Sequence, residues 1–381
     1  MASSASASPL DPLVKNEVIP ELDGVRGIAI LLVLLFHLES SYPPSITRLF
    51  FAPLLVGWSG VDLFFVLSGF LITGILMKTR NCRNYFSSFY IRRILRIMPL
   101  YLIAVFTYFV VALPLAHHWG HWQTRDNSMQ MWFWLHLSNW PPAFGNVVPF
   151  IGHFWSLSVE EQFYLIWPLV VLLVDPSRLI YLCAMVVATA FALRLAWASS
   201  SFVYYLTPFR MDALGVGCLV AVIVRDRRWF PVVRAQLRWV VLVTASLLLA
   251  VVVIARSPRP FNPWMSTLGY TCFALFYGSL VFSAYAQAGS PSWMAVLLRT
   301  SFLRTFGKYS YAIYVFHTAV TAMLDTVRVR ISEGLPLYGK VALAILCMVA
   351  SVAVSYAAAQ ASWHLLEKRC LAIKKRFAPE S

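Results

Sequence analysis

Ionisable side chains recur inside segments that are otherwise long and apolar enough to cross a bilayer, where a charge is costly to bury. The first segment reads LDGVRGIAILLVLLFHLES and contains Arg26 and His37. In a helix, this spacing of about three turns places both on one face, about 16 Å apart along the axis. His37 is therefore a candidate general base, because imidazole titrates near neutral pH. The alternative is an interfacial histidine satisfied by a backbone carbonyl.

A second segment, GWSGVDLFFVLSGFLIT, places Asp62 near one end of a predicted span. Gly69 and Thr73 follow on the same helical face, and small residues at such spacing let helices pack closely. That structural interpretation accounts for the glycine and the threonine. It does not account for Asp62, which is a candidate carboxylate for assisting a base.

The segment FYIRRILRIMPLYL carries Arg92, Arg93 and Arg96 within about one helical turn at the predicted start of a span. One interpretation is a basic anchor that fixes the orientation of the helix in the membrane. The other is an anion-binding site, because guanidinium groups bind phosphates through paired hydrogen bonds.

Acidic residues begin two further predicted spans. In GHFWSLSVEEQFYLIWPL, the adjacent Glu160 and Glu161 are followed by Tyr164, and an ordinary helix start is the alternative to a functional site. In TPFRMDALGVG, Arg210 and Asp212 form either a local ion pair or a substrate contact.

A polar stripe follows in GKYSYAIYVFHTAV, where Ser310, Tyr314, His317 and Thr321 recur at four, three and four residues. One helical face carries all four, so we expect this face to point into the bundle. With the amino terminus inside, the arginine clusters gather at the inner surface. The other ionisable candidates, His37, Asp62, Glu160, Glu161, Arg210, Asp212 and His317, fall in the outer half. This layout suggests a path for an anionic ligand that enters from the cytoplasm.

Composition identifies the elements that must position these side chains. Of the 381 residues, 60% are hydrophobic and only 12% are charged, which predicts a multi-pass protein of a cell membrane rather than a soluble domain. The net charge of +15 reflects basic loops on one side of the membrane, so no nucleic-acid partner is expected. The six cysteines lack metal-ligand spacing, so neither a disulfide framework nor a metal site is predicted.

The predicted fold is an all-α bundle, with residues 20–366 forming the transmembrane domain. Residues 1–19 are expected to be a disordered cytoplasmic tail and 367–381 a basic cytoplasmic tail. No internal repeat and no separate soluble domain are evident. Ten spans are predicted, at about 22–40, 56–78, 94–114, 154–174, 178–198, 208–225, 238–256, 264–286, 308–326 and 337–364. The stretch 129–150 is compatible with a re-entrant or interfacial piece.

Basic residues give the expected orientation. Most of the 31 Lys and Arg residues fall in the segments that share a side with the amino terminus, so both termini are predicted to be cytoplasmic. The loop 115–153 is then on the outer side.

Six blocks together closely resemble the acyltransferase 3 family of membrane acyltransferases over about residues 20–365. They are LDGVRGIAILLVLLFH, GVDLFFVLSGFLI, YIRRILRIMPLY, FWSLSVEEQFYLIWP, RMDALGVGCL and FGKYSYAIYVFH. The resemblance implies transfer of an acyl group, often acetyl, from cytoplasmic acyl-CoA to a hydroxyl of an extracytoplasmic or lipid-linked glycan. The family's Arg-ten-residues-His motif matches Arg26 and His37, its Arg-x-x-Arg motif matches Arg93 and Arg96, and its acidic segment matches Glu160 and Glu161. Some relatives carry an extra hydrolase-like domain, without which transfer is expected to finish within the membrane domain.

These roles agree with elementary chemistry. A hydroxyl needs a base within hydrogen-bond reach, and His37 suits that role, with Glu161 or Asp62 to orient it. The thioester supplies an activated acyl group, so no metal is needed. Arg26, Arg93 and Arg96 are the candidate CoA-binding residues. Candidates for binding the acceptor are Glu160, Tyr164, Arg210, Asp212 and His317.

Two other classes remain as alternatives. A transporter or flippase of an anionic amphiphile would use a similar gradient of charge, whereas a structural or sensor protein would leave the buried histidines unexplained. The acceptor, the acyl chain length, the oligomeric state and the choice between an acyl-enzyme and direct transfer stay open.

Overall fold

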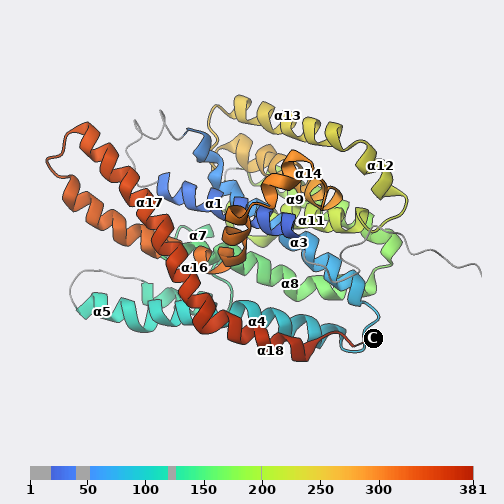
Figure 1. Cartoon of the computed structure of the whole chain (residues 1–381), viewed down its shortest axis with the longest axis horizontal. Helices are drawn as coiled ribbons and strands as arrows, with labels where there is room; N and C mark the ends of the chain where they lie inside the picture. Colours follow the sequence, from blue (N-terminus) through green and yellow to red (C-terminus); the bar gives the residue numbers. More distant parts are fainter. Residues whose placement is uncertain (1–18, 40–51, 119–125, 199, 381) are drawn as a thin grey trace, which may run out of the picture.

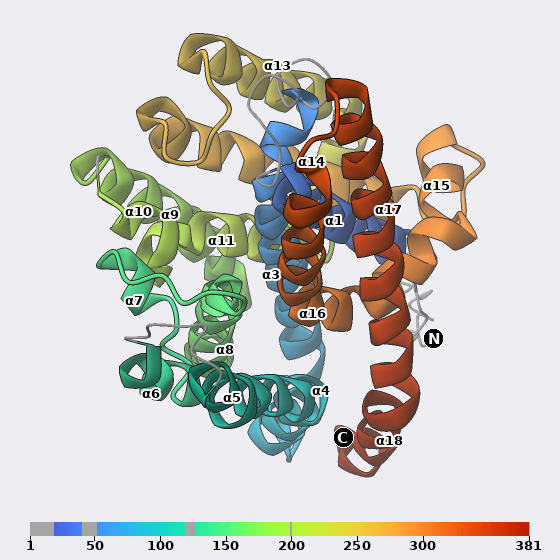
Figure 2. The same ribbon diagram turned by 90° about the vertical axis from the view of Figure 1, so that its left-hand side faces the viewer.

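The computed structural model describes residues 19–39, 52–118, 126–198 and 200–380. Within these ranges the protein is a bundle of helices without a strand (Figures 1 and 2). The predicted amino-terminal tail lies outside the described residues, apart from Ile19. The helices are α1 Pro20–Glu39, α3 Gly60–Thr79, α4 Tyr85–Phe106, α5 Leu113–His118, α6 Gln130–Trp134, α7 Trp140–Ala143, α8 Trp155–Leu173, α9 Pro176–Ala196, α10 Phe202–Tyr205, α11 Thr207–Ile223, α12 Trp229–Ala235, α13 Leu237–Ala255, α14 Tyr270–Ala286, α15 Trp293–Leu298, α16 Ser301–Ser332, α17 Leu337–Ser362 and α18 Lys368–Ile373.

Eight of the described helical stretches are long and apolar enough to cross a membrane. They match eight of the ten predicted spans, and the remaining two coincide with α1 and α16. With 20 and 32 residues, those two helices are also long enough for a bilayer. The chain is thus the predicted all-α polytopic bundle.

Helix directions follow from contacts between distant segments. Gly27 of α1 lies against the backbone of Leu303 in α16, and further along the same two helices His37 meets His317. The two helices therefore run parallel. Seven of the eight candidate spans lie between them in the sequence, and an odd number of crossings is what two parallel helices require.

Close helix crossings depend on glycine. A methyl group added at Gly69 of α3 would overlap the carbonyl of Leu214 in α11, and one added at Gly217 of α11 would overlap the carbonyl of Val66. The two backbones are in contact at this crossing, as close packing through small residues predicts. The structural interpretation of Gly69 is confirmed.

Burial separates central from peripheral helices. In both α3 and α11, 72% of the most apolar window is buried inside the protein, compared with 6% in α13. The large apolar side chains of α13, such as Trp239, Leu247 and Val253, are exposed. Because α13 is hydrophobic around its circumference, we expect it to face lipid.

One predicted boundary is wrong. The third span was expected to begin near residue 94, but α4 begins at Tyr85, because the apolar and aromatic residues that precede the arginines extend the helix. The predicted basic tail contains α18 and a 3₁₀ turn at Lys374–Phe377, which continue from α17 and pack beside α4 (Figure 1). The stretch 129–150 contains α6 and α7, whose residues Phe133 and Ala143 are buried against the bundle.

Candidate active site

A cavity of about 170 Å³ opens between α1, α3, α4, α8 and α16. One side of its lining is apolar, with Val61, Phe64 and Leu71 among its residues. The polar lining consists of Arg26, Ser68, Arg93, Arg96, Ser156, Glu160, Glu161, Tyr164, Ser310, Tyr311 and Tyr314. Six of the predicted site residues therefore meet in one place, although they come from three helices.

The arginines reach the cavity because α4 begins earlier than predicted. Arg93 and Arg96 lie beyond its second turn rather than at its start, so their guanidinium groups line an interior space. The Arg93 guanidinium lies over the Tyr164 ring, 5.0 Å from its centroid. From α1, Arg26 joins them while donating a 2.6 Å hydrogen bond to Asp23.

The acidic residues share this cavity with the arginines, which corrects the expected separation of the two by depth. Glu160 accepts hydrogen bonds from the hydroxyls of Ser68, at 2.7 Å, and Tyr164, at 3.2 Å. Within the described part of the chain, the Oε1 atom of the neighbouring Glu161 is buried without a hydrogen-bond partner. An unsatisfied buried carboxylate oxygen is costly, so Glu161 is poised to accept a proton donor.

Three histidines gather beyond the cavity. The ring of His37 lies 4.7 Å from that of His317 and 6.4 Å from that of His153, between centroids. His317 and His153 are 4.8 Å apart. Sequence reasoning singled out His37 and His317 but missed His153, although it opens the same block as Glu160 and Glu161. The spacing from His153 to the acids gave no sign that it would turn toward two other helices.

Hydrogen bonds to backbone carbonyls orient two of these rings. His37 Nδ1 lies 2.9 Å from the carbonyl oxygen of Val33, and His317 Nδ1 lies 2.7 Å from that of Tyr314. A carbonyl can only accept, so in both rings Nδ1 carries hydrogen and Nε2 is the basic nitrogen when the ring is neutral. The backbone-carbonyl interpretation of His37 thus describes its Nδ1 nitrogen.

Tyr314 joins the cavity to the histidines. Its ring lines the cavity, and its hydroxyl lies 2.6 Å from the Ser156 hydroxyl and donates to the carbonyl of His153 at 2.8 Å. Its own carbonyl accepts from His153 Nε2 at 2.8 Å and from His317 Nδ1. Ser310, Tyr314, His317 and Thr321 are all buried, which confirms that the polar stripe of α16 faces inward.

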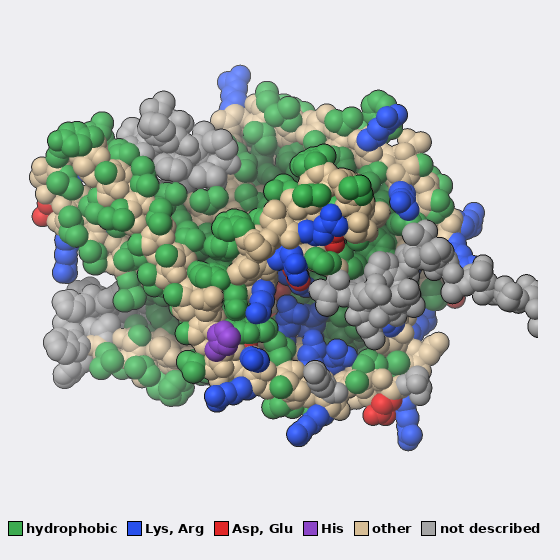
Figure 3. Space-filling view, in the orientation of Figure 1, with side chains coloured by type: hydrophobic (Ala, Val, Ile, Leu, Met, Phe, Trp, Pro, Cys, Tyr) green, Lys and Arg blue, Asp and Glu red, His purple; other side chains and the backbone are tan. Residues whose placement is uncertain are grey.

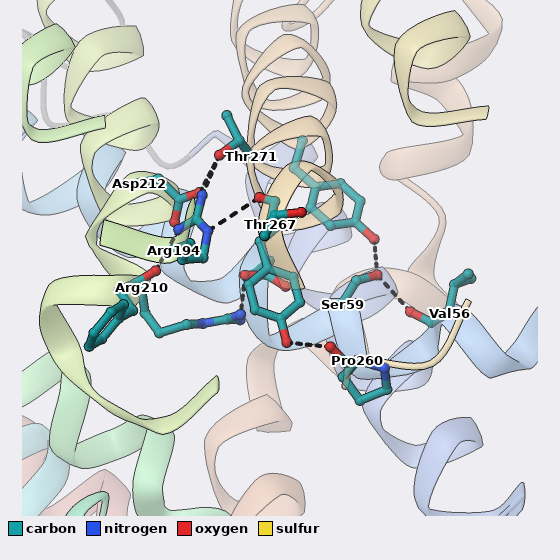
Figure 4. Close-up of polar contacts among 12 residues, drawn as sticks. Val56, Ser59, Arg194, Arg210, Asp212, Pro260, Thr267 and Thr271 are labelled. Carbon is teal, nitrogen blue, oxygen red and sulfur yellow. Dashed lines mark hydrogen bonds and ion pairs between the residues drawn. The ribbon is translucent and has the colours of Figure 1, made fainter. Parts of the chain in front are cut away.

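Asp62, Arg210 and Asp212 belong to a different cluster. The Arg210 guanidinium donates to Asp62 at 2.6 Å and Arg194 donates to Asp212 at 2.6 Å, and all four side chains are almost fully buried. Arg194 also bonds Thr271 (Figure 4). The centroid of the Tyr270 ring lies 4.3 Å from the Arg210 guanidinium carbon. The predicted local pair of Arg210 with Asp212 is wrong, because each residue pairs with another helix.

The two ion pairs tie α3, α9 and α11 together, and hydrogen bonds with Thr271 add α14. Neither Asp62 nor Arg210 lines the cavity. Of the two carboxylates predicted to assist His37, the cavity holds Glu161.

The fold and the cavity describe a polytopic membrane protein in which a cluster of three histidines adjoins an arginine-lined cavity. The sequence model of the acyltransferase 3 family, described as an acyltransferase domain, matches residues 19–360. The chain belongs to the acyltransferase 3 family.

Curated relatives are similar over most of this chain. YrhL of Bacillus subtilis (strain 168) is 27% identical over 93% of this chain and 55% of its own length. A protein of Listeria monocytogenes named peptidoglycan O-acetyltransferase OatA is 27% identical over 82% of this chain and 51% of its own. O-acetyltransferase OatA of Staphylococcus aureus (strain NCTC 8325) is 25% identical over 84% of this chain and 53% of its own. The chain spans about half the length of these relatives. No solved structure is significantly similar to it.

Proposed function

We propose that this protein is an O-acyltransferase of a cell membrane that moves an acyl group, in the first instance acetyl, from acyl-CoA to a hydroxyl of a glycan. The observation that carries the proposal is the junction at Tyr314 between the arginine-lined cavity and the three histidines. The names of the relatives, which specify O-acetyl transfer and in two cases peptidoglycan, support the reaction and the acceptor class.

The cavity suits the donor. Arg93 and Arg96 would hold the phosphates of CoA, because within the described residues no carboxylate lies within ion-pair distance of either guanidinium. Glu160, although it lines the same space, is occupied by two hydroxyl donors. The apolar wall formed by Val61 and Phe64 would accept the less polar end of the donor. The thioester supplies an acyl group that is already activated.

His37 supplies the base. Its Nε2 takes the proton of the acceptor hydroxyl as the oxygen attacks the acyl carbonyl, and the bond from that carbonyl to sulfur breaks. The departing thiolate then takes the proton from Nε2, which restores the neutral ring and balances the reaction. Val33 holds Nδ1 so that Nε2 stays the basic nitrogen. His317 and His153 pack around the ring and restrict its orientation.

The test uses purified protein in lipid nanodiscs with acetyl-CoA and muropeptide acceptors, with release of free CoA as the readout. His37→Ala should lower acceptor-dependent turnover by about 10²–10⁴ and leave acetyl-CoA affinity unchanged. His364→Ala is the matched control, because His364 is exposed and does not line the cavity. Arg93→Gln and Arg96→Gln should each weaken acetyl-CoA binding about tenfold or more.

Two results would contradict the proposal. Wild-type turnover from His37→Ala would exclude His37 as the base. Absence of CoA release from the wild type with every glycan acceptor, together with movement of the acyl donor or an anionic lipid across the bilayer, would favour a transporter.

A further inference from the structure

A second, smaller cavity adjoins the first at the end of the bundle where α4 begins. Its volume is about 60 Å³, which is room for one phosphate-sized group rather than a nucleotide. It shares Ile75, Arg93 and Arg96 with the larger cavity. Its remaining lining consists of Thr79, Ser88, Phe89, Arg92 and Lys374. The two spaces are thus neighbours separated by arginine side chains.

The charge of this second cavity is unbalanced. Arg92, Arg93, Arg96 and Lys374 line it, and none of its lining residues is acidic. In the part of the chain that the structure describes, no carboxylate forms an ion pair with any of these four cations. Burial lowers the pKa of Lys374 to about 8, and the surrounding arginines add to this effect. Four cations at one small cavity repel one another, so the site gains stability when an anion occupies it.

A clasp near the end of the chain holds Lys374 in place. Asn84, in the loop between α3 and α4, donates from Nδ2 to the carbonyl of Ala378 at 2.9 Å and accepts from the backbone N–H of Glu380 at 2.9 Å. The N–H of Arg83 donates to the Glu380 carbonyl at 3.0 Å. Figures 1 and 2 show α18 lying beside α4 near the chain's end, and Figure 3 shows Lys and Arg side chains gathered near the middle of one face.

A basic tail that only set membrane orientation would need no such arrangement. Its lysines would be solvated, whereas Lys374 is partly buried at a cavity wall. Three hydrogen bonds between the tail and one loop are also more than an orientation signal requires.

We propose that the carboxyl-terminal tail completes an anion site, in which Lys374 and Arg92 join Arg93 and Arg96 to bind a phosphate group of acyl-CoA. The proposal rests on the function proposed above for its donor. The clasp at Asn84 acts by placing Lys374, so Lys374 is the binding residue and Asn84 a positioning residue.

The experiment measures the Kd of acetyl-CoA and of inorganic pyrophosphate with full-length protein in nanodiscs. Lys374→Gln should weaken acetyl-CoA binding about five- to tenfold, as expected for one charge-assisted contact, with a smaller loss at high salt. Lys374→Arg should restore most of the affinity. Arg376→Gln is the matched control, because Arg376 is an exposed cation in the same turn that does not line the cavity.

Asn84→Ala should weaken binding in the same direction as Lys374→Gln, and the double variant should lose little more than either single variant. Additive losses would show that the clasp acts through something other than Lys374 and would overturn that part of the proposal. Unchanged affinity of Lys374→Gln for both anions would overturn the site itself. If the wild type binds pyrophosphate and loses it in Lys374→Gln but binds no acetyl-CoA, the anion site stands and the proposed donor fails.

Discussion

The imidazole rings of His37 and His317 meet edge to face, with centroids 4.7 Å apart, although they come from opposite ends of the chain. Within the described residues, His317 Nε2 is buried and has no hydrogen-bond partner. A buried, unsatisfied nitrogen costs free energy, and such groups persist where function requires them.

His317 is therefore expected to matter beyond packing. His317→Phe, which keeps a ring of similar size, should reduce turnover about ten- to a hundredfold and leave acetyl-CoA affinity unchanged. The pH dependence of kcat should also shift, because the His37 ring loses its polar neighbour. Turnover and a pH profile matching the wild type would reduce His317 to a packing residue.

Asp62 is expected to act on stability rather than on catalysis. Asp62→Asn leaves Arg210 as an uncompensated buried cation, which should destabilise the fold by about 3–5 kcal/mol. Asp62→Leu combined with Arg210→Met should recover part of that loss, because both charges are removed together. Thermal unfolding in detergent checks the stabilities. A variant Asp62→Asn that unfolds like the wild type but does not turn over would restore Asp62 as a catalytic candidate.

The distribution of basic residues predicts a topology with both termini on the cytoplasmic side. The Cys82–Asn84 loop bonds the carboxyl-terminal tail, so these two segments share one side of the membrane. An impermeant maleimide applied to intact cells should label Asn146→Cys, which is exposed in the loop before α8, and should spare Cys82. Labelling of Cys82 without permeabilisation would contradict this prediction and indicate the opposite orientation.

Acetyl-CoA binding is expected to weaken as pH rises from 7 to 9. Burial and the facing cations Arg26 of α1 and Arg92, Arg93 and Arg96 of α4 lower the pKa of Lys374 to about 8, so the lysine loses its charge within this range. The phosphates stay ionised throughout, because their second pKa lies near 6. Only the protonated lysine attracts them, so affinity is present below pH 8 and declines above it. Lys374→Gln should flatten this dependence, as measured by titration calorimetry. If that variant shows an equally steep pH dependence of affinity, a titrating group other than Lys374 causes it.

The sequence predicted the fold well because membrane solvation imposes a strong pattern. A segment that is uniformly apolar over the thickness of a bilayer can satisfy its backbone hydrogen bonds there as a helix, and α13 is the clearest example. Which residues pair between different helices was harder to predict from the sequence. Arg210 and Asp212 are two residues apart, yet their partners, Asp62 and Arg194, are on other helices. Residue spacing describes one helix face, and it cannot specify which helix packs against that face.

The carboxyl-terminal tail shows a second kind of contact that the sequence pattern does not predict. A run of basic residues after an apolar span usually marks orientation, so charge alone predicts only that residues 367–381, which include Lys374, form a basic tail. Lys374 nevertheless lines a cavity, and the tail that carries it is hydrogen-bonded to Asn84, whose amide bonds a backbone almost three hundred residues further along. No local pattern around either residue indicates that contact.

The two helices α1 and α16 cross at a point that lies equally far, along each helix, from the histidine that each one carries. Gly27 and Gly307 mark the point where the backbones meet, and His37 and His317 each lie ten residues beyond their glycine. Ten helical residues span about 15 Å, so splaying the helices by about 4° would move one ring by about 1 Å relative to the other. A shift of that size can cost about a hundredfold in rate. A bulky side chain at either glycine would thus lower the reaction rate by displacing the distant histidine rings, without touching either of them.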